Sequence, residues 1–183
     1  MSIKNAIKNI ITELNSDNNL ISQEVIENTP ERIELFYKEI FSGLKLNPSD
    51  FLKRTFPVEK DDLVLEKNIT FYSMCEHHFL PFFGKISIAY IPNGKIVGFG
   101  DLIKVIEAFS KRPQLQERLT AEIADAIFSS LNPKGVFLVV EAEHTCMTMR
   151  GVKAVGSKVI TTASRGVFDS NSNLKTEVLT LIK

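Results

Sequence analysis

Apolar residues recur every three or four positions along the first forty residues, a spacing typical of amphipathic helices. One helix is expected over residues 3–14, on the apolar positions Ile3, Ile7, Ile10, Ile11 and Leu14. A second helix is expected to begin at Asn28-Thr29-Pro30, where a capping residue precedes a proline, and to end near Gly43. The pattern weakens over residues 44–60, which predicts a connecting loop there.

From Asp61 onward the period changes to two, which indicates strands. Two strands are expected in LVLEKNITFYSM and KISIAYIP, and the next two segments, near residues 102–109 and 113–131, have helical spacing. Proline at position 113 is expected to start the second of these helices. Two more alternating segments follow, VFLVVEAEHTCMTMRG and SKVITTASRGVF, and a short helix is expected from about Asn173.

This order of elements predicts an α+β fold, in which helices pack on one side of an antiparallel β-sheet. We expect an N-terminal helical segment at residues 1–60 and a sheet-containing domain at residues 61–183.

The overall composition narrows the classes of function. Hydrophobic residues make up 44% of the 183 residues, and 22 Lys and Arg balance 22 Asp and Glu, so the net charge is zero. A protein that binds nucleic acid through phosphate contacts usually has a basic excess, so nucleic-acid binding is not expected. The N-terminus lacks the features of a signal peptide, and no apolar run approaches the roughly 20 residues that span a bilayer. We therefore expect a cytoplasmic protein, with no membrane partner and with reduced thiols.

All five cysteines and histidines fall in two short segments, CEHH at residues 75–78 and HTC at residues 144–146. Cys75 and His78 are three residues apart just after a predicted strand, so a turn can bring both side chains to one ion. Cys146 would be the third ligand. Two thiolates and an imidazole favour zinc, and three protein ligands leave the fourth tetrahedral position that catalytic zinc sites keep open. Alone, however, either cysteine would more often be a small buried apolar residue.

The second segment carries a further expectation because it alternates as a strand. Residues two apart on a strand point the same way. Four polar side chains would then share one face, placing a metal ligand, an imidazole and a fixed positive charge in a line: His144, Cys146, Thr148 and Arg150.

Three longer motifs extend these segments: SMCEHHFLPFFGKISIAYIPNGKIVG, RPQLQERLTAEIA and EAEHTCMTMRGV. Together with TPERIELFYKEIFSGL, they closely resemble the GTP cyclohydrolase I family, from about Asn28 to the C-terminus. The resemblance implies the tunnelling fold (T-fold), assembled into a homodecamer. It also implies zinc-dependent hydrolysis of GTP to formate and 7,8-dihydroneopterin triphosphate, the first step of pterin and tetrahydrofolate synthesis.

The resemblance also implies residue roles. Zinc ligands would be Cys75, His78 and Cys146. Catalytic roles fall to His77, as acid and base, and to His144 near the substrate. Guanine recognition matches Gln116 and Glu117, and triphosphate binding matches Arg150. A carboxylate at position 117 could accept bonds from the N1–H and the exocyclic amine of guanine, although in the first turn of a helix it would more often be a solvated capping charge.

One stretch departs from the family pattern. Gly100, Asp101 and Lys104 stand where the family usually has Ser, Lys and Arg, which help to hold the triphosphate. Lys104 is expected to keep the phosphate-binding charge but not the bidentate geometry of arginine. A carboxylate at position 101 is unfavourable next to a polyphosphate.

This departure keeps two alternatives open. One is a diverged paralogue that acts on another purine or on a guanine nucleotide with fewer phosphates. The other is a non-catalytic zinc- or nucleotide-binding protein, against which the presence of His77 argues.

Overall fold

The structure is a computed structural model that describes residues 2–16 and 19–183. It contains two compact units, Met1–Ser42 and Gly43–Lys183. The expected division into residues 1–60 and 61–183 was based on the change from helical to strand spacing along the sequence, and it stays a prediction.

The first unit is a pair of helices, α1 (Ile3–Leu14) and α2 (Gln23–Ile40). The predicted start of the second helix was wrong. The Ser22 hydroxyl accepts a hydrogen bond from the Val25 amide at 3.4 Å, so the helix begins at Gln23 and Pro30 lies inside it. A serine cap satisfies a backbone N–H that would otherwise lack a partner. This cap lies six residues before the Asn28 signal.

The second unit opens with short elements where a plain loop was expected. Two 3₁₀ helices, η1 (Ser42–Lys45) and η2 (Pro48–Leu52), precede strand β1 (Thr55–Pro57). Strand β1 pairs with β4 (Lys95–Val97), far along the chain. Weak apolar periodicity therefore reflected short elements rather than an irregular connection.

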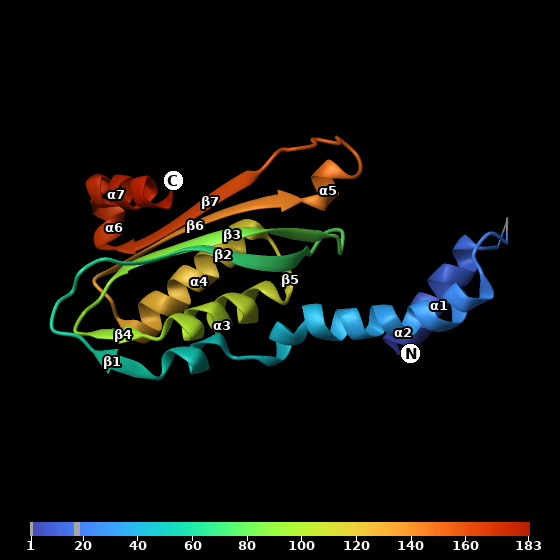
Figure 1. The fold of residues 1–183 in the computed structure, drawn as a ribbon, viewed down its shortest axis with the longest axis horizontal. Coiled ribbons are helices and arrows are strands. Elements are labelled where there is room, and N and C mark those ends of the chain that lie inside the picture. Colours follow the sequence, from blue (N-terminus) through green and yellow to red (C-terminus); the bar gives the residue numbers. More distant parts are fainter. Residues whose placement is uncertain (1, 17–18) are drawn as a thin grey trace. The chain divides into compact units, whose positions relative to one another are not determined.

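The main sheet has five strands in the order β5-β2-β3-β6-β7 (Figure 1). Neighbours are antiparallel except for β5, which runs parallel to β2. In chain order the strands are β2 (Val64–Cys75), β3 (Pro81–Ile91), β5 (Pro113–Gln114), β6 (Gly135–His144) and β7 (Val159–Gly166).

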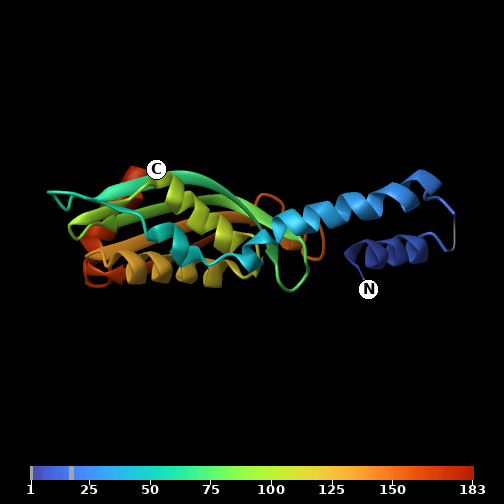
Figure 2. The ribbon, with the colours of Figure 1, turned by 90° about the horizontal axis from the view of Figure 1, so that it is seen from below.

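Helices α3 (Phe99–Ser110) and α4 (Gln116–Leu131) lie side by side across one face of this sheet (Figures 1 and 2). Alternate residues of β3 and β6 point into that layer, among them Ile86 and Leu138, which are fully buried. The intervening residues Ala89 and Phe137 pack in a smaller cluster with α6 (Val167–Ser170) and α7 (Ser172–Ile182). The predicted α+β class, an antiparallel sheet backed by helices, is confirmed.

The short strand β5 was predicted as the start of a helix, and this was wrong. Pro113 and Gln114 pair with Met74 and Cys75 at the end of β2, and the helix begins at Gln116. As a result, the end of α3, the start of α4 and the end of β2 meet at one edge of the sheet. Over residues 2–16 and 19–183, every helix is too short or too polar to cross a bilayer.

Candidate metal centre and active site

The CEHH segment forms a tight turn between β2 and β3. The Cys75 N–H donates to the Leu80 carbonyl and the Phe79 N–H donates to the Cys75 carbonyl, each at 2.8 Å. Phe79 has a φ of +51°, a conformation that non-glycine residues rarely adopt outside turns. The Glu76 N–H donates to the Gln114 carbonyl at 3.0 Å, which fixes the turn to β5. This turn brings Cys75 Sγ within 3.7 Å of His78 Nδ1.

Cys146 reaches the same place from α5 (Thr145–Thr148), a single helical turn that follows β6. The prediction that the strand continues over residues 145–150 was wrong, and so was the shared face of His144, Cys146, Thr148 and Arg150. At its C-terminal end, β6 loses both of its partner strands, β3 and β7. Its pairing with β3 ends at the Phe82–His144 pair, and its pairing with β7 ends at the Ala142–Val159 pair. Without a partner strand, the backbone groups pair locally, as in the Met149 N–H bond to the Thr145 carbonyl at 3.0 Å.

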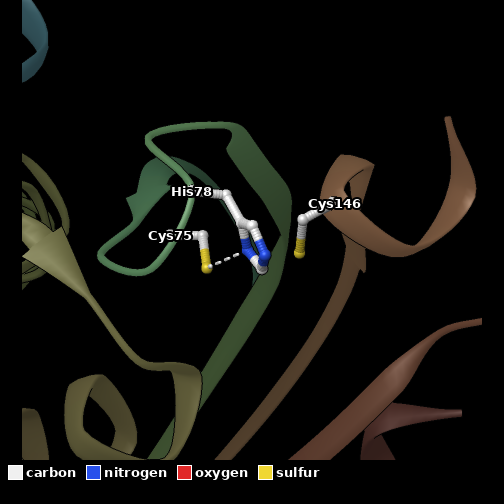
Figure 3. Close-up of side chains that lie close together, drawn as sticks. All are labelled: Cys75, His78 and Cys146. Carbon is white, nitrogen blue, oxygen red and sulfur yellow. Dashed lines mark hydrogen bonds between the residues drawn. The ribbon is translucent and has the colours of Figure 1, made fainter. Parts of the chain in front are cut away.

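The three predicted ligands nevertheless converge. The sulfurs of Cys75 and Cys146 and a ring nitrogen of His78 all lie within 4.8 Å of one another and face a common point (Figure 3). In the part of the chain that the structure describes, no other three His, Cys, Asp or Glu side chains form such a group. Two sulfurs and an imidazole are the donors that zinc prefers, and three of them leave one tetrahedral position open.

The electrostatics of this group also suit a cation. Burial raises the pKa of the Cys146 thiol, and the neighbouring Cys75 sulfur raises it further, while the Arg150 charge lowers it. Two neighbouring thiolates repel each other, and a positive charge between them removes that repulsion. A divalent ion would supply that charge.

A cavity of about 270 Å³ adjoins the three ligands. Its lining includes seven of the predicted site residues, namely Cys75, His77, His78, Gln116, Glu117, His144 and Cys146. Ligand pockets usually measure about 300–1,000 Å³, so this one lies just below that range. A larger cavity of about 550 Å³ lies on the opposite sheet face, beside α7, and contains none of the predicted site residues.

The two predicted phosphate-binding cations do not line the small cavity. Arg150 is exposed just beyond α5. Lys104 lies on α3, where its amine forms an ion pair with Asp101 at 2.9 Å. Lys104 is six residues before Ser110, the end of α3 nearest the metal ligands, which corresponds to about 9 Å along a helix.

His144, at the end of β6, is held on two sides. Its ring stacks on Phe82, with centroids 4.6 Å apart and an interplanar angle of 6°. Its Nε2 lies 2.7 Å from the Oε1 atom of Gln116. Burial lowers the pKa of His144, and the Glu117 carboxylate partly offsets this. The neutral ring is therefore favoured near pH 7.

A network that the sequence did not predict lies behind the CEHH turn. The Arg118 guanidinium forms an ion pair with the Glu76 carboxylate, and its Nε donates to Gln114 Oε1 at 2.9 Å. The other Glu76 oxygen is 3.9 Å from His77 Nε2. Gln114 and Arg118 are four residues apart, a spacing that could have suggested neighbouring side chains. The contact with Glu76 depends on the parallel β2–β5 pairing.

Comparisons with known proteins identify the family of this chain. The model of the family described as GTP cyclohydrolase I matches residues 3–183. A GTP cyclohydrolase 1 from Fusobacterium nucleatum is 57% identical over 161 residues, covering 88% of this chain and 86% of that protein. A GTP cyclohydrolase 1 from Clostridium kluyveri is 52% identical over 181 residues, covering 99% of this chain and 96% of that protein. A solved structure, archaeosine synthase QueF-Like in the apo form, has 23% identity and a TM-score of 0.46, over 57% of this chain and 93% of its own. By the family model and the curated relatives, this chain belongs to the GTP cyclohydrolase I family.

Proposed function

We propose that this protein is a GTP cyclohydrolase I. It opens the imidazole ring of the guanine of GTP by hydrolysis, giving formate and 7,8-dihydroneopterin triphosphate, and it uses zinc held by Cys75, His78 and Cys146. The observation that carries the proposal is the convergence of these three donors with His77 and Glu117 around one cavity. The reaction is inferred from membership of the family, and the cavity is where we propose that the substrate binds.

Beside the three zinc ligands, two residues of the cavity have a chemical task in this proposal, His77 and Glu117. Opening the ring requires water to add at C8, which becomes electrophilic when N7 is protonated. His77 delivers that proton and later accepts others, because an imidazole exchanges protons near neutral pH. When bound, zinc supplies positive charge that makes water acidic enough to yield hydroxide near pH 7. Glu117 accepts two hydrogen bonds from the N1–H and amine edge of guanine. Adenine cannot make this pair because its N1 is an acceptor.

The test is direct. Zinc-loaded protein is incubated with GTP, and formate and the fluorescence of the oxidised pterin product are measured. Formate released in step with pterin supports the proposal. No product from a protein with zinc bound and its assembly intact would refute it and would favour a non-catalytic zinc- or nucleotide-binding protein.

The ion pair between Asp101 and Lys104 favours a second candidate, a paralogue that acts on a guanine nucleotide with fewer phosphates or on another purine. Lys104, one of the proposed substrate-binding residues, is neutralised in this pair by its own helix. Comparing turnover of GTP, GDP, GMP and guanosine separates the two candidates. A strong preference for GTP would exclude the paralogue.

We also propose a homodecamer in the cytoplasm. The assembly follows from the family resemblance, and neighbouring protomers could supply phosphate contacts that the cavity of one chain lacks. The compartment follows from the metal site, since both cysteines must stay reduced to bind zinc. Sedimentation velocity of the zinc-loaded protein tests the assembly, and a mass other than ten chains would rule out the decamer.

A further inference from the structure

Gln116 was expected to read guanine, but its side chain is committed elsewhere. It is the first residue of α4 and only 1% exposed. Its Nε2 lies 3.2 Å from the Val140 carbonyl oxygen, 3.0 Å from the Val159 carbonyl oxygen and 3.1 Å from Thr161 Oγ1. Its two N–H groups are thus shared among three acceptors on β6 and β7, so no donor remains for a ligand.

These partners fix which way the amide points. A carbonyl oxygen can only accept a hydrogen bond, so the two strand carbonyls require the amide nitrogen, not its oxygen, on the sheet side. The reverse orientation would place three oxygens in close contact without a proton and would leave buried acceptors unsatisfied.

Two threonine hydroxyls determine that Thr161 Oγ1, the third partner of the amide nitrogen, is an acceptor. Thr120 Oγ1 lies 2.7 Å from the Gln116 backbone carbonyl, to which it donates, and 2.7 Å from Thr161 Oγ1. Because Thr120 has a single hydroxyl proton, the bond between the two hydroxyls must use the proton of Thr161. Thr161 can then only accept from Gln116, in agreement with the two carbonyls.

The orientation of the amide determines the state of His144. With the nitrogen held by the sheet, Gln116 Oε1 faces His144 Nε2 at 2.7 Å, and an amide oxygen has no proton to give. The proton of this bond therefore belongs to Nε2. In a neutral ring, Nδ1 is then the unprotonated nitrogen, and the stacked Phe82 ring opposes a rotation of the imidazole that would put Cε1 in place of Nε2.

We propose that Gln116 is a positioning residue that holds His144 as the Nε2–H tautomer, leaving Nδ1 as the only ring nitrogen able to accept a hydrogen bond from a bound ligand. The Thr120–Thr161 hydroxyl pair and the Val140 and Val159 carbonyls set this tautomer. Guanine recognition by side chains then falls to Glu117. The inference rests on the proposed function for its catalytic meaning, but the tautomer itself can be measured without turnover.

The decisive measurement is ¹⁵N magic-angle-spinning NMR of zinc-loaded, ¹⁵N-histidine-labelled, full-length protein at pH 8. An ordinary imidazole, with a pKa of about 6.5, is neutral there. The chain has three histidines, and spectra of His77→Asn and His144→Asn assign the signals. We expect a single His144 species with the proton on Nε2. Wild-type protein with the proton on Nδ1, or with a mixture of tautomers, would overturn the inference.

Two variants extend the test. Gln116→Met keeps the length of the side chain but removes both the donors and the acceptor, so His144 should become a mixture of tautomers. Its kcat should fall roughly 10- to 100-fold, the usual effect of losing a group that orients an active-site residue, with less than about a threefold change in KM. Thr162→Val is the matched control, because Thr162 is exposed and adjacent residues of a strand point to opposite faces of the sheet. It should keep the Nε2–H signal and most of the activity.

The outcomes separate this inference from the proposed function. A raised KM with unchanged kcat in Gln116→Met would show that Gln116 binds guanine and would refute the positioning role. Inactive wild-type protein with the Nε2–H tautomer would refute the cyclohydrolase function but not the tautomer. If Gln116→Met fails to assemble, the wild-type spectrum still decides.

Discussion

The metal centre and the first turns of α3 use charged and polar residues in opposite ways. At the metal centre, Cys75 and His78 come from one turn and Cys146 from a distant segment, and all three donors face one point. On α3, Asp101 and Lys104 come from a single helix and pair with each other in solvent. The first arrangement leaves three donors that could hold a cation, whereas the second leaves little net charge to attract a phosphate.

This difference indicates which steps of the proposed reaction the residues of a single chain could perform. The groups proposed to open the ring and read the purine meet in one cavity, held by the sheet edge and by the start of α4. The groups proposed to bind phosphate, Lys104 and Arg150, lie outside that cavity. We therefore expect substitutions at the metal centre to abolish the reaction and substitutions on α3 to adjust it.

The largest effect is expected from Cys146→Ala. Removing one of three ligands leaves too few donors for a stable zinc site, so zinc content should fall well below one per chain and formate release should drop to background. Zinc is measured by atomic emission. Met149→Ala, an exposed position just after the same one-turn helix, is the control and should retain metal and activity. Full zinc occupancy in Cys146→Ala would mean that the ligand set is wrong.

The next effect is expected from His77→Asn. Loss of a general acid and base usually lowers the rate by about 10²- to 10⁴-fold, while Cys75, His78 and Cys146 are untouched. Zinc content should therefore remain that of the wild type, and kcat/KM for GTP should fall within that range. A variant that loses zinc as well would assign His77 to the metal rather than to proton transfer.

A smaller effect is expected from Glu117→Gln. The variant keeps the shape but loses the charge and one acceptor, and a hydrogen bond to a charged group contributes about 1.5–3 kcal/mol. The KM for GTP should rise roughly 10- to 100-fold. Glu107→Gln, on the exposed side of α3, is the control. An unchanged KM would mean that Glu117 is only a helix-capping charge.

The smallest effect is expected from Asp101→Asn, which releases Lys104 from its ion pair. Exposed pairs contribute about 0–1 kcal/mol, so the KM for GTP should fall by no more than about fivefold. Turnover of GMP should not change, since GMP lacks the outer phosphates. A change of the same size for both nucleotides would place Asp101 and Lys104 outside phosphate binding and would sharpen the contrast with the metal centre.

Much of this molecule could be predicted from sequence because its signals are local. Strand periodicity and the change to helical spacing predicted the sheet and α3, α4 and α7. The clustering of cysteine and histidine in two segments predicted which side chains would meet. The error at residues 145–150 arose because alternation alone does not make a strand. A strand also needs a partner strand. The pairing of β6 with β3 ends at His144 and its pairing with β7 ends at Ala142, so the residues that follow have no partner strand.

The role of Gln116 could not be predicted for a related reason. The family resemblance paired Gln116 with Glu117 in guanine recognition and gave no information on what its side chain contacts. The carbonyls that hold its amide belong to Val140 and Val159, on strands that only the folded sheet brings beneath α4. The Arg118–Glu76 contact is similar, since it depends on β5 pairing with β2.

The proposed metal ligands come from two distant parts of the chain, which has a consequence for the stability of the protein in the cell. An ion that joins the β2–β3 turn to α5 cross-links two distant parts of the chain, and the unfolded chain cannot bind it in the same way. Its binding energy therefore adds to folding stability, by about 2.7 kcal/mol when the free metal concentration is one hundred times its dissociation constant. In cells starved of zinc we expect faster proteolysis, so that supply of the metal sets how much of this protein persists.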